Sequence, residues 1–428
     1  MKNLFFLLII YSFISSAEGQ ITLEYCQQKA KTNYPLVKQY ELLEQSRKYN
    51  LNHTFKAYIP QISLSGKATW QSDITEFPED FSNLLDQFNA SISFPGKDQY
   101  NIAIELNQTI LDGGSSLIQK KTINAQNDLD KQELEVNLYT LTEQINQLFF
   151  SILLMDEQIR QNILLNEELD RNYTLVSSYI ENGVGQQSDL DEIKVEILSS
   201  GQRDMEMRTS RKTFIRMLSA FIGEDIADDA SFIRPSAEYD TNEPLNRPEL
   251  VYYDLQIDLI EQQKKMLWAK AMPNLSLFAK GAYGNPGLNM FKSGFTPYFV
   301  GGVQLSWNFG TFYTFGDEKN IFKTQGLQAE MQREIFQFNM QQKLIQKNSE
   351  IEKLQNLLEN DMEIIRLRED IQKTADVKVA NGTMSIDDLL RCINLTSVAR
   401  QNKSYHEIQL LLAIWQLKTE KGLIVVSD

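Results

Sequence analysis

The chain contains two copies of one plan, and this duplication restricts its fold more than any other feature. The stretch "IENGVGQQSDLD" (180–191) recurs as "VANGTMSIDDLL" (379–390), so that Asn182-Gly183 aligns with Asn381-Gly382. An Asp-Leu pair follows each glycine at the same offset, and "YIPQISLSGK" (58–67) recurs as "AMPNLSLFAK" (271–280). Internal repeats indicate a fold assembled from equivalent units. We therefore expect a first structural repeat over 20–230 and a second over 231–428.

The N-terminus has the composition of an export signal. The stretch "MKNLFFLLIIYSFISSAEGQ" combines the basic Lys2, an apolar run and a cluster of small residues. Because the apolar run is too short for a permanent membrane helix, we expect residues 1–19 to be a signal peptide. The formal net charge of −15 excludes a broadly basic nucleic-acid-binding face. Cys26 and Cys392 are too few for a disulfide framework and are expected to be unpaired.

Four segments alternate between apolar and polar residues with a period of two. In the first, Ile62 and Leu64 fall on one face and Ser63 and Ser65 on the other. The pattern predicts strands over about 61–71, 99–111, 274–284 and 297–309. A tilted strand that crosses a bilayer has this length and these two faces. An ordinary half-exposed antiparallel sheet alternates in the same way, so the alternation alone leaves both alternatives open.

Two very long helices are predicted, one in each repeat. In the first, apolar residues follow a spacing of 3.5 residues, which is typical of a coiled coil; they are Leu134, Leu138, Leu141, Ile145, Leu148, Ile152, Met155 and Ile159. We expect this helix to begin after Gly114 and to end at Asn182, and its copy to cover about 317–380. Helices of about 100 Å cannot fold back onto a compact core. The pattern therefore predicts an extended rod in which these residues only hold helices together.

Helix-turn-helix tips are expected at the ends of both long helices, over 181–188 and 380–386. Gly183 and Gly382 suit the left-handed residue that ends a helix. Ser188 with Asp191, or Ser385 with Asp388, resembles the capping box that starts a returning helix. Structural capping explains the glycines and serines as well as a functional role does. It explains less well why both copies keep Asp-Leu at one offset.

Four strands are too few to close a membrane barrel, because the smallest barrels have about eight. If these strands cross a membrane, several chains must share one barrel, and three chains would give 12 strands. The expected fold is an α+β membrane protein with four transmembrane β-strands and a duplicated unit of long coiled-coil helices. Three copies would form a 12-stranded β-barrel that continues as a periplasmic α-helical barrel.

The layout resembles the TolC-like outer-membrane efflux proteins over about residues 21–421. The motifs that carry the resemblance are "YIPQISLSG", "AMPNLSLFA", "LDGG" and the two Gly-x5-Asp-Leu turns, with Leu where the family often has Val. The resemblance implies a homotrimer in the outer membrane with its helical barrel in the periplasm. It also implies a periplasmic adaptor that binds the tip and an inner-membrane pump of the RND or ABC type.

The same resemblance assigns roles to tip residues. Those matching the adaptor-facing positions are Gly183, Val184, Gly382 and Thr383, and those near the closed aperture are Asp189 and Asp388. The sequence departs from the family at Arg391, where a second acid is expected. This departure leaves open a pairing between Asp388 and Arg391. The segment 71–99 would be a long external loop.

Two classes of function compete. The first is a passive exit duct for efflux or type I secretion, opened by an adaptor and powered by a separate pump. The second is a structural or adhesive trimeric coiled coil on the cell surface, which explains the heptads but not the four strands or the returning helices. No catalytic, cofactor or metal motif is present, and His53 is expected to be a surface residue, so we expect no enzyme activity. The cargo is not specified by these features.

Overall fold

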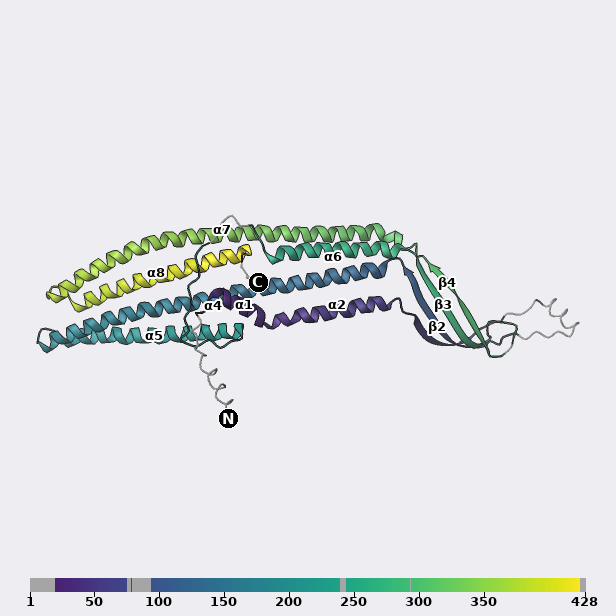
Figure 1. The fold of residues 1–428 in the computed structure, drawn as a ribbon, viewed down its shortest axis with the longest axis horizontal. Coiled ribbons are helices and arrows are strands. Elements are labelled where there is room, and N and C mark those ends of the chain that lie inside the picture. Colours follow the sequence, from purple (N-terminus) through teal and green to yellow (C-terminus); the bar gives the residue numbers. More distant parts are fainter. Residues whose placement is uncertain (1–19, 75–77, 79–93, 239–243, 293, 424–428) are drawn as a thin grey trace, which may run out of the picture. The chain divides into compact units, whose positions relative to one another are not determined.

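The structure is a computed structural model that describes residues 20–74, 78, 94–238, 244–292 and 294–423. The expected signal peptide and most of the expected external loop over 71–99 lie outside the described residues. These residues are mostly helical and include one antiparallel sheet (Figure 1). Within the described part of the chain, none of the helices combines the length and the apolar character needed to cross a membrane.

Contacts divide the chain into two compact units, and each unit draws on both sequence repeats. Unit 1 comprises Met1–Tyr40, Gln132–Tyr252 and Arg333–Asp428. Unit 2 comprises Glu41–Lys131 and Tyr253–Gln332. The long helices begin in unit 2 and continue into unit 1. The duplication is therefore not a pair of separate domains.

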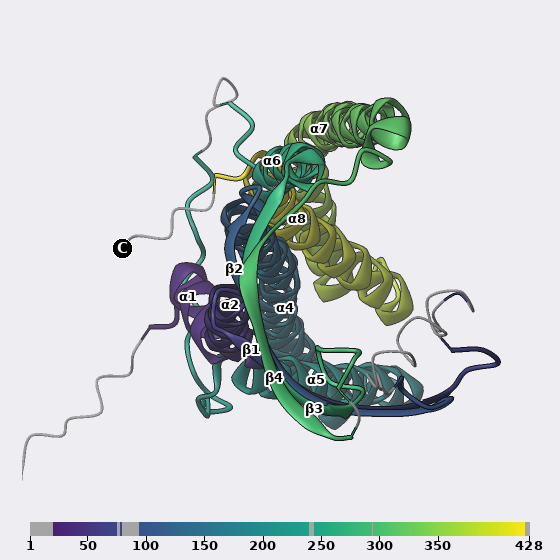
Figure 2. The same ribbon diagram turned by 90° about the vertical axis from the view of Figure 1, so that its right-hand side faces the viewer.

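Unit 2 contains the sheet, whose strands follow chain order. They are β1 (Gln61–Trp70), β2 (Asp98–Asp112), β3 (Asn274–Asn285) and β4 (Thr296–Ser306), all antiparallel. These bounds lie within three residues of the expected strands. The sheet is strongly curved (Figure 2). In the described residues, β1 and β4 each pair with one neighbour only, so both edges of the sheet are open.

The two faces of the sheet differ in chemistry. The register places Leu64 opposite Ile104 and Leu277 opposite Val303, so apolar residues from all four strands share one face. This face is exposed; its large side chains include Ile62, Leu64, Ile102, Ile104, Tyr283, Phe299, Val303 and Leu305. On the other face, Glu105 pairs with Lys280 at 2.6 Å and Asn101 donates to the Tyr298 hydroxyl at 2.8 Å. The expected alternation of two faces is confirmed.

The "LDGG" stretch joins β2 to the first long helix through a tight turn. The Asp112 carboxylate accepts the backbone N–H of Gly114 at 3.0 Å and that of Ser116 at 2.7 Å. Gly113 has φ +65°, and a Cβ there would lie 2.6 Å from the Ala269 carbonyl oxygen. Because this position needs both a left-handed backbone and a close approach, only glycine fits. Helices α2 (Lys38–Lys56) and α6 (Pro248–Ala271) lead into β1 and β3.

The long helices have the expected extent at three of their four ends. Helix α4 (Ser115–Glu181) has 67 residues and starts and stops as predicted. Helix α7 (Thr311–Ala380) has 70 residues and begins six residues before the expected position 317. The reason is local: the Asn308 side chain accepts the Gly310 N–H at 2.9 Å, so the helix starts directly after the strand. The returning helices are α5 (Gln187–Ile222) and α8 (Ile386–Lys421).

The coiled-coil seam of α4 is buried in unit 1 and contributes to its apolar core. The seam residues Leu134, Leu138, Leu141, Ile145, Leu148 and Ile152 are buried. Leu141, Ile145 and Ile152 of the seam belong to a central cluster. Its other members lie on α1 (Leu23–Asn33), α5 and α8 and include Leu23, Cys26, Ile215, Leu218, Ile408 and Trp415. A short 3-10 helix, η1 (Pro35–Val37), follows α1. Cys26 is buried and Cys392 half-buried; both are free, and His53 is exposed, as expected.

Candidate functional site at the helix-turn tips

The first tip is a tight turn between α4 and α5, which lie side by side in Figure 1. The Gly183 N–H donates to the Ile180 carbonyl at 2.9 Å, and the Val184 N–H donates to the Tyr179 carbonyl at 2.9 Å. These are the two bonds of a Schellman motif, which satisfies the last carbonyls of a helix. Gly183 has φ +76°, so the predicted left-handed residue is confirmed.

The second tip, between α7 and α8, ends its outgoing helix with the same motif. The Gly382 N–H donates to the Val379 carbonyl and the Thr383 N–H to the Lys378 carbonyl, both at 2.9 Å. Gly382 has φ +70°. The Thr383 hydroxyl adds a bond to the Lys378 carbonyl at 3.0 Å. The two turns are therefore equivalent up to the glycine and the residue after it.

The starts of the returning helices differ, and one expected capping box is wrong. Ser385 is the N-cap of α8, and its hydroxyl accepts the Asp388 N–H at 3.2 Å and donates to the Asp388 carboxylate at 2.8 Å. The N-cap of α5 is Gln186, which makes no side-chain capping bond. Ser188 is already inside α5, and a capping residue must be extended, as Gln186 is (φ −108°, ψ 144°).

This register explains the repeated Asp-Leu pairs. Asp189 and Asp388 are each the third residue of a returning helix, three positions after the N-cap. An acidic side chain in the first turn is stabilised by the positive end of the helix dipole, by about 0.3–1 kcal/mol. The shared offset of the aspartates is thus favoured by the helix start itself, in addition to any role at an aperture.

The residues expected to face an adaptor are at the surface of unit 1. Gly183, Gly382 and Thr383 are exposed, and Val184 is 77% exposed. An added Cβ at either glycine would meet no atom within 4 Å. The tips are therefore open to a partner, and an exposed valine is an apolar contact that the chain itself leaves uncovered.

A groove of about 790 Å³ lies between the first turns of α5 and α8. Each wall presents one helical face, and the charged side chains that line it are Asp191, Glu192, Glu196, Asp387 and Arg391. Arg391 thus comes together with acids from both helices, while Asp388 is engaged by Ser385. Among the described residues of this chain, Arg391 makes no ion pair within 4.0 Å. Sequence reasoning named Asp191 only as part of a capping box and missed Glu192, Glu196 and Asp387, although the helical spacing from Ser188 to Glu196 was visible.

Behind the turns, all four helices share an apolar tip cluster. Its buried members are Leu165, Leu169, Val176, Ile193, Ala375, Val379, Ile386, Leu389, Leu390 and Ile393. Glu168 borders this cluster and contacts Gln372 of α7, while Arg400 of α8 lies 4.0 Å away. Burial raises the pKa of Glu168, because Arg400 and Arg171 offset only part of the desolvation. The tip-side packing thus contains a carboxylate whose ionised form is destabilised by burial.

Comparisons with known proteins agree with this geometry. The solved structures with a similar fold include VceC of Vibrio cholerae (12% identity, 92% of this chain and 95% of that one, TM-score 0.65). They also include MtrE of Neisseria gonorrhoeae (12%, 94% and 88%, 0.64) and CmeC of Campylobacter jejuni (13%, 94% and 85%, 0.60). All three are outer-membrane proteins, and MtrE and CmeC are described as channels. A search of curated protein sequences found no match.

The fold is therefore that of the outer-membrane channels. Residues 27–224 also match the family model described as outer membrane efflux protein. Over residues 27–224 the chain thus resembles the outer membrane efflux proteins, and the shared fold extends over 92% of its length.

Proposed function

We propose that this protein is the outer-membrane exit duct of a tripartite efflux or type I secretion system. It acts as a homotrimer and as a passive channel, opened by a periplasmic adaptor and powered by an inner-membrane pump of the RND or ABC type. The observation that carries the proposal is the four-stranded sheet with two open edges, one exposed apolar face and one polar face. No catalytic chemistry and no cofactor are part of it.

The open edges of the sheet can pair with strands of other copies, and its exposed apolar face can contact lipid. Unpaired strand edges bind other strands, so β1 of one copy would pair with β4 of the next. Three copies then close a barrel of 12 strands, which is wide enough for a pore. The apolar face would contact outer-membrane lipid, and the polar face with Glu105 and Lys280 would line the pore.

The full-length protein purified in detergent tests the assembly. We expect three chains per particle by light scattering and ion conductance in planar bilayers. A water-soluble monomer would contradict the proposal and favour the surface coiled coil. Leu64→Arg places a charge on the apolar face and should block insertion into the outer membrane. Ser65→Arg, on the next residue and the polar face, is the matched control and should insert.

The tip residues Gly183, Val184, Gly382 and Thr383 are proposed to bind the adaptor, because they are exposed at both turns of unit 1. A photo-reactive amino acid at Val184 or Thr383 should cross-link in intact cells to a periplasmic protein with a long helical hairpin. The product should disappear when the adaptor gene is deleted. The same probe at Met205, which is 71% exposed on α5, is the control. Equal cross-linking from Met205 would remove the assignment.

Asp189, Asp388 and Arg391 are proposed to restrict the aperture of the trimer, and a pairing of Asp388 with Arg391 of another copy is part of this proposal. Asp189→Ala combined with Asp388→Ala should increase ion leak through the trimer in planar bilayers. Asp191→Ala removes an acid from the groove instead and is the control. Unchanged conductance of the double variant would show that these aspartates serve only the helix starts.

A further inference from the structure

Between the tip cluster and the central cluster, unit 1 is crossed by a layer of buried polar side chains. The tip cluster lies on one side and the central cluster on the other. All four long helices contribute to this polar layer, which we define as Glu157, Gln161, Asn162, Ser200, Asp361, Ser404 and His406. On α4, for example, the layer lies between Leu153 of the central cluster and Leu165 of the tip cluster. All of these residues except His406 are buried.

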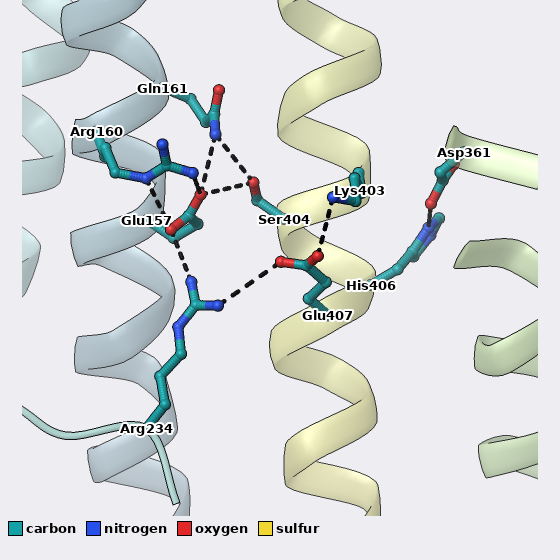
Figure 3. Close-up of polar contacts among 9 residues, drawn as sticks. All are labelled: Glu157, Arg160, Gln161, Arg234, Asp361, Lys403, Ser404, His406 and Glu407. Atoms are coloured by element: carbon teal, nitrogen blue, oxygen red, sulfur yellow. Dashed lines mark hydrogen bonds and ion pairs between the residues drawn. The ribbon is translucent and has the colours of Figure 1, made fainter. Parts of the chain in front are cut away.

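Glu157 is the centre of the layer, as Figure 3 shows. Its carboxylate accepts hydrogen bonds from Gln161 at 2.9 Å and from Ser404 of α8 at 2.9 Å. Arg160 and Arg234 complete the shell, with Arg234 at 2.7 Å. Burial acts to raise the pKa of Glu157, but these hydrogen bonds together hold it below its ordinary value. The charge is therefore well satisfied.

The other members tie the remaining helices. Asn162 donates to the Ser200 carbonyl at 3.0 Å, and the Ser200 hydroxyl donates back to the Asn162 side chain at 2.8 Å, which joins α4 to α5. His406 lies 2.6 Å from Asp361, which joins α8 to α7 (Figure 3). One layer thus links all four helices through bonds with specific partners.

Such a layer resists sliding more than it resists separation. A helix that slips by one turn loses these bonds, and each buried polar group left unpaired costs about 1–3 kcal/mol. Buried polar residues fix the register of coiled coils for the same reason. The apolar packing of the tip cluster is, however, not continuous with that of the central cluster.

Some buried polar groups on the tip side are incompletely satisfied, and on the other side of the layer Glu420 Oε2 also has no hydrogen-bond partner among the described residues. The buried Gln372 Oε1 has no hydrogen-bond partner among the described residues, and Glu168 is a carboxylate with a raised pKa. Strain of this kind destabilises the packing beyond the layer and leaves the layer itself intact. These groups lower the cost of opening the tip-side packing.

We propose that the polar layer is a joint, which keeps the four helices in register while the helix segments on its tip side open and close. This inference rests on the proposed exit duct, because an opening tip has a role only in a channel. In this proposal Glu157, Asn162, Ser200 and Ser404 hold the helices in register while the tip opens, although none of them belongs to the tip turns.

Hydrogen exchange on the full-length trimer tests the joint. Asn162→Leu with Ser200→Ala replaces both partners of one pair by apolar groups and makes the two clusters continuous. The added burial should slow exchange by about tenfold in 165–200 and leave 141–153 unchanged. Open events in planar bilayers should become rarer. Gln27→Leu with Asn146→Leu, a buried pair inside the central cluster, is the matched control and should not change exchange at the tip.

A milder variant keeps the inference testable if the double variant fails to assemble. Ser404→Ala removes one donor and leaves Glu157 with Arg160, Gln161 and Arg234. Exchange should then be faster at the tip and unchanged in 141–153. Equal changes on both sides of the layer, or none, would overturn the joint. A trimer that conducts without these patterns rejects only the joint, whereas a chain that neither trimerises nor conducts rejects the exit duct.

Discussion

The two tip turns are copies of one motif that have diverged at a single step. Both outgoing helices end in the same Schellman motif, with the same two backbone bonds. The returning helices start differently, because Ser385 caps α8 with its hydroxyl and Gln186, which occupies the same place in the first copy, makes no capping bond. A helix end that requires a left-handed residue tolerates few substitutions of its glycine. A helix start tolerates more, because the N-cap bond is one of several contributions to its stability.

This difference shows that the glycine turn tolerates little change in sequence, whereas the N-cap of the returning helix tolerates more. The glycine turn has no low-cost alternative, since each φ lies in the left-handed region. The N-cap can be lost at a cost of about 1 kcal/mol. The α5 start, which lacks the cap, is accordingly the weaker of the two returning ends. If an adaptor moves one turn more readily, the comparison favours the first.

The largest expected effect comes from the feature that the two turns share. Gly183→Ala and Gly382→Ala should each destabilise the local turn by about 1–2 kcal/mol, because a left-handed alanine clashes with its own carbonyl. Nothing else lies within 4 Å of the added Cβ, so the two costs should be equal. Hydrogen exchange of the last turns of α4 and α7 measures this. A clearly larger effect at one glycine would mean that the turns are not equivalent.

Much of this comparison could be predicted from the sequence, because it depends on local rules. The glycines at 183 and 382, the "LDGG" turn and the alternation in β1 each follow from a few neighbouring residues. The cap at Gln186 could not be predicted, because glutamine is a poor N-cap and Ser188, two residues later, is a good one.

The polar layer also could not be predicted from the sequence. Glu157 and Ser404 are 247 residues apart, and a polar residue in a heptad pattern is normally assigned to the solvent side. The groove acids of α5, Asp191, Glu192 and Glu196, are an intermediate case. Their spacing showed one helical face, but only the packing of α5 against α8 shows that this face lines a groove. Long-range pairing, rather than local conformation, is what the sequence left undetermined.

The second effect concerns the step at which the turns differ. Ser385→Ala should cost about 1 kcal/mol at the start of α8, because the Asp388 N–H loses its acceptor. Ser188→Ala is the matched control in the first copy and should have almost no effect, since Ser188 is already helical. Exchange of amides in the first turns of α5 and α8 reports both. A loss at Ser188 as large as that at Ser385 would contradict the assignment of Gln186 as N-cap.

The converse change tests whether the divergence can be reversed. Gln186→Ser supplies the missing hydroxyl at a residue whose backbone is already extended, so it should stabilise the start of α5 by about 0.5–1 kcal/mol. Exchange in the first turn of α5 should then approach that of α8. Gln187→Ser, one residue further, is the control and should give no gain. No change with Gln186→Ser would show that contacts other than the cap set the conformation of the first turn.

The smallest expected effect depends on pH and concerns a difference between the two outgoing helices, α4 and α7. Glu168 of α4 is largely buried, whereas Leu367, its counterpart on α7 under the shift that aligns the two turns, is exposed. Since burial raises the pKa of Glu168 above 4.5, the ionised group destabilises the tip side, and acidification through the raised pKa restores stability. Glu168→Gln keeps an acceptor for Gln372 and should stabilise the tip side at pH 7. The gain should disappear below about pH 4.5, where the carboxyl of the unchanged protein is protonated in both the folded and the unfolded state.

Glu363→Gln is the control. It replaces an exposed carboxylate whose pKa is lowered by Arg366, and it should not stabilise the protein at any pH. A gain that persists below pH 4.5 would mean that the amide improves packing and that the buried charge is not what loosens the tip.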